Sequence, residues 1–227
     1  QKKFRLFINF ILSQKNSTST SVSSQGGEQL TDFEINASDY DENRHFFLGH
    51  FFRDNYDKNM AMLPSIVSGV KITRIELWVT NKRSSYESPR NIIAFTDLGE
   101  SEHISNAIWS STGGPATDNS ANDLYHRIAN DYPQARDIDN VATTLGGFLM
   151  GSTDYEKISN ARKLSESEYT LNSSLGYISL RNALSSDEVL AVAFEYTYAG
   201  QSYQVGEFSS DITDSGNALY VKLLKSN

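Results

Sequence analysis

The chain has 227 residues, which is long enough to bury one substantial hydrophobic core without help from disulfides or metals. It contains no cysteine, and this excludes a disulfide framework, a thiolate zinc site and a cysteine nucleophile. The net charge is −8 and the lysines and arginines form no basic stripe, so we expect no nucleic-acid partner. No apolar run approaches the ~20 residues of a transmembrane helix, and the 12 Tyr and 12 Phe favour sheet.

The first predicted element is a β-strand over residues 4–12, because its even-numbered residues are all apolar. A Ser- and Thr-rich tract over residues 13–29 is typical of a loop, and residues 30–37 are expected to return as a second strand. The chain begins with Gln1 rather than methionine, so we expect it to be a piece of a longer protein.

The next segment combines aromatic residues with a strong strand pattern. Residues 45–52 are expected to form a buried strand, followed by a short helix that Asp54 caps and Pro64 ends. Residues 70–81 carry the clearest strand signal, and the phase of their apolar residues slips early in the strand, which predicts a β-bulge. Residues 90–98 are predicted to pair with that strand in antiparallel fashion.

The middle of the chain changes to helical spacing. Residues 122–132 carry apolar residues three and four apart, which predicts an amphipathic helix. A second short helix is expected after Asp137, as its cap, and before Gly146 and Gly147. A third helix is predicted over residues 153–161.

Strand character returns in the last quarter of the chain. Residues 175–180 predict a strand, residues 190–205 predict a hairpin that turns at Ala199 and Gly200, and residues 219–223 predict a closing strand. We therefore expect a mainly β fold, a β-sandwich or jelly roll with a few short helices in its middle, with α+β as the alternative class.

Residues 1–227 are expected to form a single β-rich domain. The helical region at residues 101–161 could instead be an insertion within it.

The polar motifs give no catalytic, cofactor-binding or metal-binding residue. His45 and His50 lie five apart, a spacing that suits neither a helical nor a strand metal pair, so we interpret them as structural or surface histidines. His103 and His126 are isolated in the sequence. Carboxylate pairs are frequent in so acidic a chain, and residues 210–217 are typical of a turn rather than a calcium loop.

Two tryptophans are the candidate ligand-stacking residues. Trp78 and Trp109 could stack on a sugar from the surface of a sandwich, which makes a carbohydrate-binding β-sandwich module of a cell-surface protein the alternative function. Trp78 lies in an apolar strand, so packing in the core is the competing interpretation.

Four long strings carry a likeness to a known family. They read FEINASDYDENRHFFLGHFFRDNYDKNMAMLPSIVSGVKITRIELWVTN at residues 33–81, RNIIAFTDLGE at 90–100, ARDIDNVATTLGG at 135–147, and DYEKISNARKLSESEYTLNSSLGYISLRNALSSDEVLAVAFEYTYAGQSYQVGEFSSDI at 154–212. Together these strings resemble the SprA family of gliding-motility and secretion proteins, also called Sov in some relatives.

The resemblance implies that the chain is a fragment of the outer-membrane translocon of the type IX secretion system of Bacteroidetes, a giant β-barrel through which folded cargo leaves the cell. It further implies a soluble, non-catalytic structural and interaction domain, and no enzyme. Expected partners are the remainder of the parent barrel protein, other secretion-system components or secreted cargo.

The expected location is the cell envelope, at the outer membrane, with the periplasmic and cell-surface sides both open. The resemblance also gives residues 4–12 a second interpretation. We expect this strand to pair within the domain, with its even-numbered face buried. A membrane strand of the parent barrel is the alternative.

Overall fold

A computed structural model describes residues 41–82, 88–114 and 116–227. The predicted strands at residues 4–12 and 30–37, and the loop between them, lie outside the described residues. The chain divides between Glu42 and Asn43, and the fold described below is that of residues 43–227.

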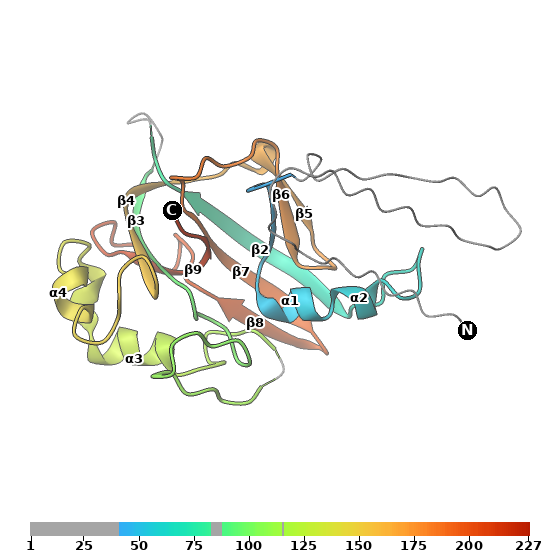
Figure 1. Cartoon of the computed structure of the whole chain (residues 1–227), viewed down its shortest axis with the longest axis horizontal. Helices are drawn as coiled ribbons and strands as arrows, with labels where there is room; N and C mark the ends of the chain where they lie inside the picture. The colour runs from blue at the N-terminus through green and yellow to red at the C-terminus, as the bar shows by residue number, and fades with distance from the viewer. Residues whose placement is uncertain (1–40, 83–87, 115) are drawn as a thin grey trace, which may run out of the picture. The chain divides into compact units, whose positions relative to one another are not determined.

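Within these residues a six-stranded sheet curls until it meets itself (Figure 1). Its strand order is β2-β4-β3-β9-β7-β8, and β2 also pairs with β7, so five strands form a closed ring and β8 is attached to the second half of β7. The β3–β9 pair is parallel and the other pairs are antiparallel. The strands are β2 (Val70–Val79), β3 (Arg90–Phe95), β4 (Tyr155–Lys163), β7 (Leu190–Tyr198), β8 (Gln201–Val205) and β9 (Leu219–Lys225).

The interior of the ring is a small apolar core to which every ring strand contributes. Trp78 comes from β2 and is its largest side chain, while β7 contributes only Ala191 and Ala193. A barrel of five strands leaves little room inside, so large and small residues must alternate across it. The ring strands contribute Trp78, Ile92, Ala94, Ile158, Ala161, Ala191, Ala193, Leu219 and Val221.

Much of the outer face of the ring is buried as well. A three-stranded sheet in the order β1-β6-β5 and the short helix α1 supply side chains to this second core, and the short helix α2 follows α1. Phe52 is almost fully buried there, with its ring centroid 5.7 Å from that of Phe194 and 5.3 Å from that of Tyr196. These elements are β1 (His45–Phe47), α1 (His50–Asp54), α2 (Tyr56–Asn59), β5 (Tyr169–Asn172) and β6 (Tyr177–Leu180), with the 3₁₀ helix η3 (Glu166–Glu168) before β5.

A helical excursion connects β3 to β4. It contains α3 (Leu124–Asp131), the 3₁₀ helix η2 (Pro133–Arg136) and α4 (Val141–Leu145), which lie together at one side of the ring (Figure 1). Leu124, Ile128, Val141 and Leu145 are buried in the same outer core as Phe52. The excursion and the ring therefore share one hydrophobic cluster.

Several sequence predictions are confirmed. The fold is mainly β with a few short helices. The strand predicted at residues 70–81 is β2, and its register with β7 shifts between Ile72 and Arg74, where the bulge was expected. The predicted hairpin is β7–β8, whose turn residues Ala199 and Gly200 both have positive φ. The helix predicted at residues 122–132 is α3.

The pairing predicted for residues 90–98 is wrong. β3 lies between β4 and β9 rather than beside β2. Neighbouring strands in a sequence usually pair, but here the first strand of the ring bonds to the third and fourth. Closing the ring decides this order, and local sequence carries no signal for it.

The helix predicted at residues 153–161 is also wrong, because this segment is β4. Its buried apolar residues Tyr155, Ile158 and Ala161 are three apart, a spacing that is typical of a helix. Tyr155 faces the outer core and Ile158 faces the interior of the ring. Ala161 faces the interior as well, because Asn160 adopts a positive φ and the register with β3 shifts by one residue there. A β-bulge thus gave the buried apolar residues of a strand the spacing expected of a helix.

Two predicted caps and one predicted strand also need correction. Only residues 45–47 of the aromatic run form a strand, since α1 begins at His50. Asp54 ends α1 and does not cap α2, and Asn140 rather than Asp137 precedes α4. Asp137 instead accepts hydrogen bonds from Asp139 N and Asn140 Nδ2, at 3.0 and 2.7 Å, and so closes the turn before α4.

Candidate functional site

The two candidate stacking residues are both buried. Trp78 is 1% exposed inside the ring, and Trp109 is 5% exposed in the outer core, in edge contact with Phe148. They belong to different clusters and share no surface. A sugar needs an open ring face, so the carbohydrate interpretation loses the two side chains on which it depended.

The fold brings together two histidines that the sequence keeps apart. The rings of His50 and His103 stack with their centroids 4.5 Å apart, although His103 had appeared isolated. His45 and His126 lie elsewhere, each within hydrogen-bond distance of a serine hydroxyl, Ser179 and Ser120 respectively.

These two stacked rings form the centre of a chain of ionisable groups, which we call the polar cluster. At its buried end the Lys222 Nζ lies 2.6 Å from Glu100 Oε1, and His50 Nδ1 lies 3.1 Å from the same oxygen. At its exposed end His103 Nε2 lies 2.5 Å from Asp54 Oδ2. The cluster therefore links a fully buried ion pair to the surface.

The polar cluster keeps its two carboxylates ionised. Burial raises the pKa of Glu100, but the Lys222 ammonium and His50 lower it by more, so the pKa lies below its usual value. Burial also raises the pKa of Asp54, and the hydrogen bonds from His103 and Arg53 outweigh it and bring the pKa below the usual value. Each carboxylate thus has a cationic or hydrogen-bonding partner within the fold.

Part of the polar cluster borders an open pocket of about 330 Å³. Phe51 and Tyr198 form its apolar wall, and Asp54, Glu102 and His103 contribute polar groups. Of these groups, Asp54 and His103 are already paired with each other.

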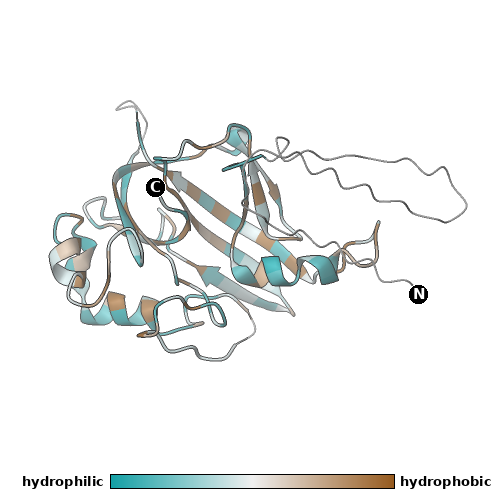
Figure 2. Ribbon diagram, viewed as in Figure 1, coloured by the Kyte–Doolittle hydropathy of each residue, from teal (hydrophilic) through white to brown (hydrophobic). Residues whose placement is uncertain are grey.

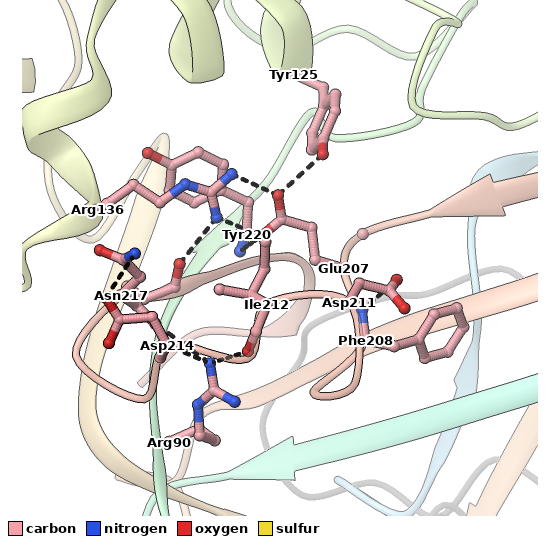
Figure 3. A network of polar contacts seen from close by, with 12 residues as sticks. Arg90, Tyr125, Arg136, Glu207, Phe208, Asp211, Ile212, Asp214, Asn217 and Tyr220 are labelled. Carbon is pink, nitrogen blue, oxygen red and sulfur yellow. Dashed lines mark hydrogen bonds and ion pairs between the residues drawn. The ribbon is translucent and has the colours of Figure 1, made fainter.

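A second polar network fastens the helical excursion to the C-terminal part of the ring (Figure 3). Arg136 donates to both carboxylate oxygens of Glu207, each at 2.6 Å, and its guanidinium lies 3.9 Å from the centroid of the Tyr220 ring. Glu207 also accepts hydrogen bonds from Tyr125 Oη and Tyr220 N, each at 2.9 Å. Glu207 is only 2% exposed, so water contributes little to its solvation, and these partners balance its charge.

Arg90 performs a similar task for the loop between β8 and β9 (Figure 3). Its guanidinium donates to four backbone carbonyl oxygens, those of Ser209, Ile212, Asp214 and Asn217, at 2.9–3.4 Å. In the same loop the Asp214 carboxylate accepts a hydrogen bond from Gly216 N at 3.0 Å, the contact of a turn.

Sequence reasoning missed both of these networks. Their one local signal is a charged residue placed among apolar neighbours, such as Arg90 at the start of β3 and Glu207 between Val205 and Phe208. The partners lie far away in the sequence, so their identity could not be read from spacing.

Two further properties concern the described residues as a whole. None of their helices has both the length and the apolar character that crossing a membrane requires. Across residues 41–82, 88–114 and 116–227, no group of three or more His, Asp or Glu side chains is arranged to hold a metal ion.

Comparison with known protein families gives a match. The family model SprA_N, described as "motility related/secretion protein", matches residues 6–198. No curated protein matches the chain. The matched residues include every described element from β1 to β7 and cover well over half of the sequence. The chain therefore belongs to the SprA_N family of motility-related and secretion proteins.

Proposed function

We propose that this domain is a non-catalytic structural and interaction domain of the type IX secretion and gliding-motility translocon in the outer membrane. The family match over residues 6–198 is the observation that carries the proposal. In this role the domain contacts the remainder of the parent barrel protein, other secretion-system components or secreted cargo.

The use of charge in the domain supports a structural role. The buried charges of Glu100, Lys222 and Glu207 are all satisfied by internal partners. Perturbed ionisable groups in a cleft are candidates for catalysis, but ion-pair networks that hold a fold together perturb pKa values as well. Here the paired charges instead hold the helical excursion, the ring and the connecting loops in one arrangement.

The proposal is tested by an in-frame deletion of residues 43–227 from the full-length parent protein in its own host. We expect the amount of cargo in the medium and the gliding speed to fall, while growth in rich medium is unchanged. An immunoblot of the outer-membrane fraction must show that the shortened parent protein is still inserted. Normal export and gliding by such cells would contradict the proposal.

A further inference from the structure

The loop between α2 and β2 exposes an unusual amount of apolar surface. Residues 60–67, which we call the apolar loop, expose Met62 by 70%, Leu63 by 62%, Ile66 by 42% and Val67 by 64%. Across the described residues the exposed large hydrophobic side chains number six, and these are four of them. Figure 2 shows the hydrophobic colour of the loop beyond the end of α2.

The apolar loop has a defined shape rather than being a loose connection. Val67 N donates to Asn59 O at 3.3 Å, which closes the base of the loop, and Ser65 N donates to Met62 O at 3.0 Å, which forms a turn at its tip. Asn59 is buried, and Pro64 fixes its own φ in the middle of the segment. A loop that is ordered before it binds loses less conformational entropy on binding.

The charges around the apolar loop indicate what surrounds it in a complex. No charged residue occurs from Asn59 to Val70, and Lys58 and Lys71 flank this stretch on both sides. Both lysines are exposed, and neither forms an ion pair in the part of the chain that the structure describes. An apolar centre with a charged rim is the composition of a protein–protein interface. The nearest charge on each side of the loop is positive, with the exposed Asp57 one residue further away, so the complementary surface is apolar with an acidic rim.

A second copy of this chain does not fit as the occupant. Four side chains expose only a few hundred Å², whereas a stable interface needs about 800 Å² from each partner. A symmetric pairing through the apolar loop would also bring the flanking lysines of both copies together. The loop must therefore enter a concave surface on a different protein.

A membrane surface fits less well than a protein. Segments that bind at the bilayer interface combine large aromatic residues with several basic ones. The apolar loop contains no aromatic residue, and the chain as a whole has a net charge of −8, which opposes binding to anionic lipids.

We propose that the apolar loop inserts Met62, Leu63, Ile66 and Val67 into an apolar groove with an acidic rim on another protein of the secretion apparatus. This inference rests on the proposed function, because it names the surface through which the domain acts. Met62 suits such a contact because its flexible side chain adapts to an irregular groove.

The first experiment places a photo-crosslinking residue, p-benzoylphenylalanine, at Leu63 of the full-length parent protein in living cells. Met150 is the matched control, because it is an isolated apolar side chain with 66% exposure. We expect a protein adduct from position 63 and none from position 150. Peptide mapping of the adduct must find apolar residues with neighbouring Asp or Glu. An adduct to lipid, or to a second copy of the parent, would overturn the proposal.

The second experiment uses Leu63→Asp and Val67→Asp, with Met150→Asp as the control. Each charge enters the centre of the predicted contact, so we expect about a tenfold or greater loss of the cross-link and a parallel fall in exported cargo. The purified 227-residue chain carrying each substitution should keep its urea midpoint, because all three side chains are exposed. Unchanged export by the Leu63 and Val67 variants would contradict the proposal.

The outcomes of these experiments distinguish a failure of this inference from a failure of the proposed function. If deleting residues 43–227 impairs export but the loop variants export normally, the interface is wrong and the proposed function stands. If cells that lack residues 43–227 export cargo normally, both the interface and the proposed function are wrong.

Discussion

At the scale of single residues, buried charges come in pairs whose members are distant in the sequence. Glu100 and Lys222 are 3% and 4% exposed and meet at 2.6 Å, and Arg136 reaches Glu207 with two hydrogen bonds. Taking such charges out of water costs several kcal/mol per ion, which only a well-placed partner offsets. Removing one member should therefore destabilise the fold more than removing both.

Arg136→Met tests this at the network in Figure 3. The substitution leaves the Glu207 carboxylate buried with only Tyr125 Oη and Tyr220 N as donors, so we expect the free energy of unfolding to fall by about 3–5 kcal/mol. Urea denaturation at pH 7 measures it.

The controls for this substitution are a second change and a surface pair. Arg136→Met combined with Glu207→Gln should recover part of the loss, since no unpaired charge remains. Lys82→Met breaks the exposed pair with Asp187 and should leave the urea midpoint unchanged. A loss below about 1 kcal/mol for Arg136→Met would show that the pair is not needed.

The lowered pKa of Glu100 predicts how the stability of the fold changes in acid. Its pKa in the folded state lies below the ordinary value of 4.5, because Lys222 and His50 outweigh the effect of burial. The carboxylate therefore stabilises the fold above pH 4.5, and this contribution is lost as the pH falls through the lower pKa of the folded state. Glu100→Gln should be less stable at neutral pH and lose stability less steeply below pH 4.5. Urea denaturation at several pH values compares the slopes, and parallel profiles would contradict the assignment.

At the scale of elements, β7 shows how one strand serves two cores. Its even-numbered residues from Leu190 to Tyr196 face the outer core, while Ala191 and Ala193 face the interior of the ring. The sequence alternates large with small rather than apolar with polar, because neither face of the first part of the strand meets water. Such alternation lets a five-stranded ring close tightly while its outer face carries a second layer.

The β5–β6 turn provides a prediction at the same scale, with a matched control. Gly176 has a φ of +65°, and an added Cβ would lie within van der Waals overlap of the Phe52 ring. Gly200 has a φ of +80°, and an added Cβ would meet no atom within 4 Å. Both alanine substitutions carry the backbone cost of about 1–2 kcal/mol, and Gly176→Ala adds about 1–3 kcal/mol for overpacking.

Thermal and urea unfolding of Gly176→Ala and Gly200→Ala measure this difference. We expect Gly176→Ala to be the less stable variant, since Phe52 is held against Phe194 and Tyr196 and cannot move away freely. Equal stabilities would mean that the second layer adjusts without cost at this contact.

At the scale of the whole molecule, the helical excursion and the ring depend on one another. The outer core combines Leu124, Ile128 and Val141 of the excursion with Val192 and Phe194 of the ring. A shared core of this kind favours a single cooperative unfolding transition. We therefore expect the excursion not to unfold as a separate domain.

The two tryptophans make this testable, since one lies in each part. Trp109→Phe leaves Trp78 as the reporter inside the ring, and Trp78→Phe leaves Trp109 as the reporter of the excursion. In each variant the urea transition followed by tryptophan fluorescence should coincide with that followed by far-UV circular dichroism. Loss of the Trp109 signal well before the loss of secondary structure would indicate an independent helical domain.

The sequence by itself determined those elements whose signal is local. The β7–β8 hairpin follows from alternation on both sides of Ala199 and Gly200, which adopt the positive φ that a tight turn needs. Helix α3 follows from apolar residues at helical spacing. The resemblance of long strings to the SprA family was likewise present in the sequence, and the family match agrees with it.

Only the tertiary structure decided which strands pair, which rings are buried and which charges meet. Residue periodicity reports which residues share a face of one element, but not what covers that face. Closing the sheet into a ring placed β3 between β4 and β9 and enclosed Trp78, and a bulge at Asn160 gave a strand the spacing of a helix. The stacking of His50 on His103 has the same origin, because contacts between distant segments exist only once the chain has folded.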